Sequence, residues 1–181
     1  MTFNENPSTP PAATAEANQP DAVDSRGSLP REPMSEHTQV NGSCFCGAVR
    51  FSIKTPTLFC VHCHCSMCRR SHGAGFVTWL ALPNERFAME AGEAELVRFQ
   101  SSDHGTRSFC SRCGSTLFCE STQRPGEIDI VLANMETPID RAPQAHIYFE
   151  DRADWAFVDD GLPRLGGPDG TTPLDAANES G

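Results

Sequence analysis

The chain has 181 residues and a formal net charge of −10, with 14 Lys and Arg residues against 24 Asp and Glu residues. Most of the negative charge lies near the two ends, so the middle of the chain is close to neutral. A chain without a basic surface has little electrostatic attraction for nucleic acid or for an anionic membrane, and the sequence predicts neither as a partner.

The two ends have the composition of unfolded segments. Residues 1–37 and 166–181 are rich in small, polar and acidic residues and have almost no large apolar side chains, so they can bury too little surface to offset the entropy of ordering. We therefore predict a disordered segment over 1–37, one folded domain over 38–165 and a disordered tail over 166–181. Since no secretion signal or long apolar run is visible, a cytoplasmic location is expected.

Short strands are predicted through the middle of the chain, where apolar and polar residues alternate. In chain order the candidates are 49–53, 76–83, 96–99, two strands within 107–120, 127–134 and 145–150. The only helical piece is expected around Ser66–Ser71, and the many Gly and Pro residues elsewhere fit turns. The predicted fold class is all-β, made mainly of antiparallel short strands that bound zinc holds together.

Seven of the nine cysteines fall into three tight clusters, which are Cys44/Cys46, Cys63/Cys65/Cys68 and Cys110/Cys113. Thiolates one or two residues apart can reach a single tetrahedral ion, whereas such neighbours are awkward disulfide partners. Seven thiolates do not make two closed four-sulfur sites. Four can close a structural zinc site, and three would hold a second zinc whose fourth position is open, which is the feature that distinguishes catalytic zinc.

The two pairs Cys44/Cys46 and Cys110/Cys113 are expected to close the structural site. The segment 44–46 is predicted to be a strand, on which both thiols of the C-x-C motif point the same way and Phe45 points away. Gly114 supplies the permissive backbone of a metal-binding knuckle. Because the pairs are far apart in the sequence, this zinc would join distant strands, and folding would depend on it.

The cluster of Cys63, Cys65 and Cys68 is expected to hold the second zinc, with His64 turned away from it. Cys60 could complete a four-thiolate site and remove the open position. The apolar context of Cys60 instead favours packing as a small hydrophobic residue.

Other residues near the clusters are candidates for a role at the site or for an ordinary structural role. Arg69 and Arg70 could bind a carboxylate or balance the charge of the thiolates. His146 is expected to be a satisfied strand histidine rather than a donor at the site, and Cys119 is expected to be another core cysteine. Trp79 and Trp155 are expected to pack in the core or at its rim.

Several segments together resemble a known family. They are NGSCFCGAVRF, CHCSMCRRSHGAGFVTW, SSDHGTRSFCSRCGSTLF, PQAHIYFEDRADW and LPRL. Over about 40–165 they are similar to the glutathione-dependent formaldehyde-activating enzymes, a family that includes centromere protein V. The resemblance implies a zinc-bound β-tent fold of the Mss-four-like type. It also implies a structural zinc on the C-x-C and C-x-x-C pairs and a catalytic zinc on the C-x-C-x-x-C residues. Tyr148 stands where relatives often carry Trp, and Leu165 stands where they often carry an aromatic residue.

The activity that the resemblance implies is condensation of glutathione with formaldehyde to S-(hydroxymethyl)glutathione, with a carbon–sulfur lyase reaction in reverse. The expected function is thus that of a zinc-dependent lyase or synthase acting on a thiol adduct, with glutathione and formaldehyde or another aldehyde as small-molecule partners. The alternative is a non-catalytic zinc-binding module that binds a protein partner. The acidic ends count against polyanionic partners for such a module.

Overall fold

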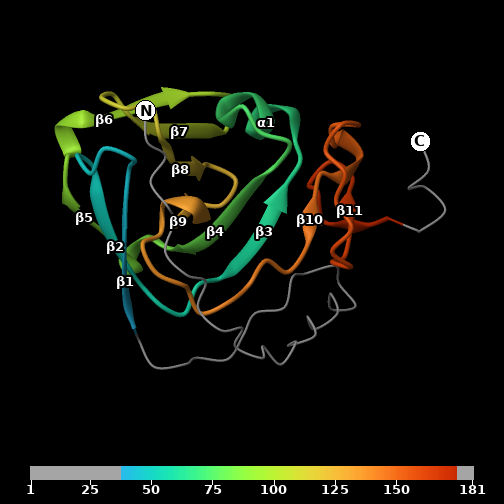
Figure 1. The fold of residues 1–181 in the computed structure, drawn as a ribbon, viewed down its shortest axis with the longest axis horizontal. Coiled ribbons are helices and arrows are strands. Elements are labelled where there is room, and N and C mark those ends of the chain that lie inside the picture. Colours follow the sequence, from blue (N-terminus) through green and yellow to red (C-terminus); the bar gives the residue numbers. More distant parts are fainter. Residues whose placement is uncertain (1–37, 175–181) are drawn as a thin grey trace, which may run out of the picture.

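The computed structural model describes residues 38–174, which form three β-sheets and one short α-helix (Figure 1). The predictions of disorder over 1–37 and 175–181 lie outside the described residues. The strands are β1 (Gln39–Ser43), β2 (Arg50–Lys54), β3 (Phe59–Cys63), β4 (Val77–Pro83), β5 (Phe87–Ala91), β6 (Leu96–Gln100), β7 (Gly105–Cys110), β8 (Thr116–Ser121), β9 (Glu127–Val131), β10 (His146–Ile147), β11 (Leu165–Gly166) and β12 (Thr172–Pro173). The helix is α1 (Ser66–His72), and four 3-10 turns are η1 (Asn84–Arg86), η2 (Glu93–Glu95), η3 (Leu132–Asn134) and η4 (Phe149–Asp151).

The largest sheet has seven strands in the order β10-β3-β4-β9-β8-β7-β6. Every pairing in it is antiparallel except that of β10 with β3. A second sheet has the order β1-β2-β5, and β11 pairs with β12 in a third. Mostly antiparallel pairing of short strands confirms the predicted all-β class. Within 38–174, no helix is long and apolar enough to cross a membrane.

The strand register shows that the two faces of the large sheet bury different sets of side chains, and the first face packs into the main core. Cys60 on β3 lies opposite Leu80 on β4, which in turn lies opposite Ile130 on β9. These residues belong to the main hydrophobic core, where Phe51 of the β1-β2-β5 sheet meets Phe118 edge to face with ring centroids 5.0 Å apart. Removing a buried ring such as that of Phe51 costs about 3–5 kcal/mol. One face of the large sheet therefore provides the core.

The opposite face of the same sheet carries the residues that alternate with those core residues along each strand. Val61 lies opposite Trp79, which lies opposite Val131, and Cys63 lies opposite Val77. Because side-chain direction alternates along a strand, this row faces away from the main core. Val77, Trp79 and Val131 of this row form a smaller apolar cluster with the cysteines around α1. The candidate site therefore stands on the sheet face that the core leaves free.

Several predicted elements need correction. Cys44 and Cys46 follow β1 in a turn rather than lying on a strand, and the predicted strand 127–134 ends at Val131 and continues as η3. The predicted strand 145–150 is reduced to β10, because Tyr148 takes a positive φ of 52° that ends the extended chain. Ordered pairing also continues into the stretch assigned to the tail, since β11 and β12 pair over 165–173.

Candidate metal centres

The thiols of Cys44, Cys46, Cys110 and Cys113 converge from segments far apart in the sequence. Their four sulfur atoms all lie within 4.8 Å of one another. The Sγ of Cys46 is 3.5 Å from that of Cys44 and 3.9 Å from that of Cys110. Four sulfur atoms gathered in this way match the donor set of a closed tetrahedral zinc site.

Two tight turns place these sulfur atoms. In the first, the Gly47 amide donates to the Cys44 carbonyl oxygen at 2.9 Å, and the Val49 amide donates to the Cys44 Sγ at 3.3 Å. In the second, the Gly114 amide donates to the Cys110 carbonyl oxygen at 2.8 Å, with Gly114 at a φ of 75° that favours glycine. The expected glycine knuckle is therefore present after Cys113, and a matching turn replaces the expected strand at the first pair.

Ser115 supports the first cluster from the second turn. Its hydroxyl lies 3.3 Å from the Cys113 Sγ, and it accepts a hydrogen bond from the Phe45 amide at 3.1 Å, which links the two turns. Hydrogen bonds from the Ser115 side chain and backbone lower the pKa of Cys113 to about 5. A thiol that ionises below neutral pH is ready to bind a cation.

The second cluster is built at the junction of β3 and α1. Cys63 ends β3, Cys65 caps the start of α1 and Cys68 lies in the first turn of the helix. Their sulfur atoms lie within 4.8 Å of one another, and the Cys68 amide donates to the Cys65 Sγ at 3.3 Å. All three cysteines are buried. The C-x-C-x-x-C spacing therefore works because a strand end passes directly into a helical turn.

Arg107 of β7 reaches this cluster from across the sheet. Its Nη2 donates to the Cys68 Sγ at 3.4 Å, and its guanidinium lies over the Trp79 ring at 5.9 Å. Hydrogen bonds from the thiols of Cys63 and Cys65, followed by the charge of Arg107, lower the pKa of Cys68 to about 2. One member of the cluster is therefore a thiolate at neutral pH.

Apolar side chains and one phenol surround the second cluster. Val77, Trp79 and Val131 belong to the same buried cluster, and Cys119, Ile147 and Tyr148 pack against it as partly buried residues. The Tyr148 ring lies against Gly170, where an added Cβ would approach the ring to 2.7 Å. Burial, followed by the electrostatic influence of Cys63 and Cys65, raises the pKa of Tyr148, so the phenol keeps its proton.

His64 turns to a separate polar network instead of joining the cysteines. It is fully buried, and its Nε2 lies 2.8 Å from the Nδ1 of His146. The Nε2 of His146 lies 3.0 Å from the Asp160 carboxylate, which can only accept, so His146 donates there and accepts from His64. Burial, followed by the charges of His146 and His62, lowers the pKa of His64 to about 4 and keeps it neutral.

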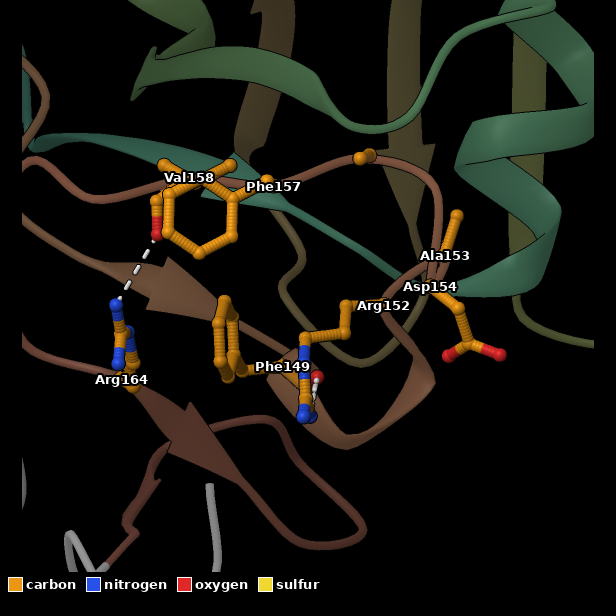
Figure 2. A pocket seen from close by; sticks show the side chains of 8 residues that line it. Phe149, Arg152, Ala153, Asp154, Phe157, Val158 and Arg164 are labelled. Carbon is orange, nitrogen blue, oxygen red and sulfur yellow. Dashed lines mark hydrogen bonds between the residues drawn. The ribbon is translucent and has the colours of Figure 1, made fainter. Parts of the chain in front are cut away.

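A cavity of about 250 Å³ adjoins this histidine network (Figure 2). The Phe149 ring meets His64 edge to face and lies between the guanidinium groups of Arg152 and Arg164, at 4.8 Å and 4.9 Å. Arg164 also donates to the Val158 carbonyl oxygen at 3.1 Å. None of the described cysteines lines this cavity, so it does not open onto either sulfur cluster.

The structure separates the remaining sequence candidates. Cys60 is in neither sulfur group and lies fully buried in the main core, where burial raises its pKa to about 12. The Arg69 Nε donates to the His64 carbonyl oxygen at 3.0 Å and so holds the backbone between two cysteines, whereas Arg70 is exposed. Trp155 is 75% exposed, contrary to the expected packing, and Cys119 lies at the wall of the second cluster rather than in the core.

Sequence reasoning missed Arg107, which is the cation that touches a thiolate. The expectation placed charge balance on Arg69 or Arg70 because they adjoin the cluster along the chain. The available signal was the register of alternation in 107–110, since Arg107 and Cys110 must face opposite sides of a regular strand. That pattern predicts that the Arg107 side chain lies on the face opposite to Cys110, but it does not predict which residue Arg107 contacts.

Both sulfur groups could hold metal ions, and donor sets made only of cysteine thiols are consistent with zinc. The first offers four ligands. The second offers three among the described residues, which leaves room for a further ligand. The donor chemistry of the chain therefore fits the metal that the sequence predicted.

Comparisons with known proteins place these centres in a family context. Residues 39–151 match the family model described as glutathione-dependent formaldehyde-activating enzyme. A Halomonas elongata protein, provisionally named as such an enzyme, is 28% identical over 127 residues, which cover 66% of this chain and 81% of that protein. An uncharacterized lyase of Schizosaccharomyces pombe is 32% identical over 87 residues, which cover 44% of this chain and 56% of that protein. The crystal structure of a Rhodobacter sphaeroides protein matches with a TM-score of 0.47 and 24% identity, over 56% of this chain and 92% of that one.

Proposed function

Because the chain belongs to the glutathione-dependent formaldehyde-activating enzyme family, we propose that it catalyses the reversible addition of the glutathione thiol to formaldehyde. The product is S-(hydroxymethyl)glutathione, and the reverse reaction is a carbon–sulfur lyase reaction. The observation that carries the proposal is the buried group of Cys63, Cys65 and Cys68, which gathers three sulfur ligands beside the partly buried side chains of Cys119, Ile147 and Tyr148.

We assign one zinc ion to each sulfur group. Cys44, Cys46, Cys110 and Cys113 would hold a structural ion, since four thiolates complete its coordination. Cys63, Cys65 and Cys68 would hold a catalytic ion. Zinc with a free fourth position supplies Lewis acidity, which stabilises a thiolate or polarises a carbonyl oxygen.

The proposed reaction is balanced without any oxidant or reductant. A bond forms between the thiol sulfur and the formaldehyde carbon while the carbonyl π bond opens toward oxygen, and the proton lost from the thiol ends on that oxygen. Trp79 and Val131 limit water around the sulfur atoms, because their apolar side chains form the floor of the site. Tyr148 keeps a proton on its phenol oxygen and can donate a hydrogen bond to a substrate oxygen.

The test is exchange spectroscopy with the full chain. Glutathione and 13C-labelled formaldehyde equilibrate with their adduct, and two-dimensional exchange NMR measures the interconversion rate with and without protein. We expect the zinc-loaded protein to accelerate exchange, Cys65→Ala to lose the acceleration, and Cys60→Ala to retain it as the matched control from the same segment. Two zinc ions per chain with only the uncatalysed exchange rate would refute the proposal and favour the protein-binding module.

A further inference from the structure

Arg107 is buried beside the second sulfur cluster without a carboxylate partner among the described residues. Only 8% of its surface is exposed. Its one hydrogen bond among these residues goes to the Cys68 Sγ, and its Nε and Nη1 atoms are buried with no partner. Because a buried guanidinium needs a compensating negative charge, the thiolate cluster is the natural counter-ion of Arg107.

Strand pairing explains how Arg107 is held there. Arg107 lies opposite Cys119 on β8, which lies opposite Asp129 on β9, so all three side chains share the sheet face that carries Trp79. Asp129 is already paired with Arg124 at the far side of this row. Arg107 is therefore directed toward Cys68 by the sheet and is not drawn away by the nearest carboxylate in the row.

The charge of the cluster shows what Arg107 can change. Three thiolates around a divalent cation have a net charge of −1, and a substrate thiolate beside them brings the total to −2. With Arg107 included, the totals are 0 and −1. Bringing an anionic thiol to a dry, already negative site is unfavourable, and a fixed positive charge offsets this repulsion.

We propose that Arg107 is a positioning residue that offsets the negative charge of the Cys63, Cys65 and Cys68 group and thereby allows the site to accept a thiol as an anion. This inference rests on the proposed function and extends it, because it names the ionic form in which the thiol is taken. At separations of about 6–12 Å and an effective dielectric constant of about 20, one unit charge changes the affinity for an added anion by roughly ten- to hundredfold.

The test replaces zinc with Co²⁺, whose absorption reports each thiolate that joins it. The full chain is titrated with glutathione and, separately, with 2-mercaptoethanol, which carries a thiol but no carboxylate or peptide group. The variants are Arg107→Met, Arg107→Gln and Arg107→Lys. Arg70→Met is the matched control, because it removes an exposed positive charge from the helix that carries Cys68.

We expect Arg107→Met and Arg107→Gln to weaken binding of both thiols at least tenfold, Arg107→Lys to restore most of the loss, and Arg70→Met to bind as the unsubstituted chain does. If Arg107→Met does not fold, the comparison of Gln with Lys still decides, since only Lys keeps the charge. Equal binding by the Gln and Lys variants would overturn the inference. Binding of 2-mercaptoethanol but not glutathione by the unsubstituted chain would instead reject glutathione as the substrate, while the Arg107 comparison would still be read with the smaller thiol.

Discussion

The two sulfur clusters should differ sharply in how much they stabilise the fold, and the comparison of Cys113→Ala with Cys65→Ala measures that difference. The first cluster joins residues separated by 64 positions between Cys46 and Cys110, whereas Cys63 and Cys68 are only five residues apart. Because loop-closure entropy grows as (3/2)RT ln n, the long link stabilises the fold by about 2 kcal/mol more than the short one. Cys113→Ala should therefore lower the free energy of unfolding by about 2 kcal/mol more than Cys65→Ala.

Burial alone predicts that Cys65→Ala destabilises the fold more than Cys113→Ala, so the comparison distinguishes the two explanations. Cys65 is buried and accepts a hydrogen bond at the start of α1, whereas Cys113 is only partly buried. The assay is urea unfolding in saturating zinc, with zinc content measured for each variant. If each variant loses one zinc and Cys65→Ala is destabilised as much as Cys113→Ala, or more, the entropic reasoning is wrong.

Three further outcomes are expected. Cys60→Ala should keep both zinc ions and unfold at a free energy lowered by only about 1 kcal/mol, and loss of the second zinc would contradict the sulfur grouping. A chain ending at 165 should melt several degrees below one ending at 174, because it lacks β12 and Gly170, and equal melting temperatures would show that the β11–β12 pair adds nothing. Burial raises the pKa of Asp129 to about 6, so its ionisation disfavours the fold as pH rises from about 4 to 6. Relative to Asp129→Asn, the unsubstituted chain should lose up to ~3 kcal/mol over that range, and a pH-independent difference would refute this.

The strands and sulfur groups were accessible from the sequence because they depend on local pattern. Alternation marked most of the strand segments, and the C-x-C and C-x-x-C spacings can be satisfied by turns within each segment. The turn at Cys44–Cys46 was mistaken for a strand, because a turn with a positive φ at Gly47, after which the Val49 amide donates to the Cys44 Sγ, leaves no periodic signal. The spacing of ligands was therefore a safer guide than the backbone inferred to carry them.

Contacts between segments far apart in the chain could not be predicted from the sequence. Arg107 meets Cys68 across 39 residues, and His64 meets His146 across 82, because the order of the sheet places β10 beside β3 and because α1 lies against β7 and β8. No local pattern encodes that order. The position of Tyr148 was hidden for a related reason, since neither its positive φ nor its contact with Gly170, between β11 and β12, leaves a signal in the local alternation.

The exclusion of Cys60 from the second cluster follows from parity along one strand. On β3, side chains alternate, so Cys60 and Cys63, three residues apart, must face opposite sides of the sheet. Cys63 faces Val77 and the sulfur group, whereas Cys60 faces Leu80 and the main core. Cys65, two residues after Cys63, is on the same side by alternation, and Cys68 joins them because the chain leaves the strand after Cys63 and enters α1. A fourth thiolate from Cys60 would require β3 to be broken inside the core. For this reason the Cys60→Ala variant should keep its second zinc ion.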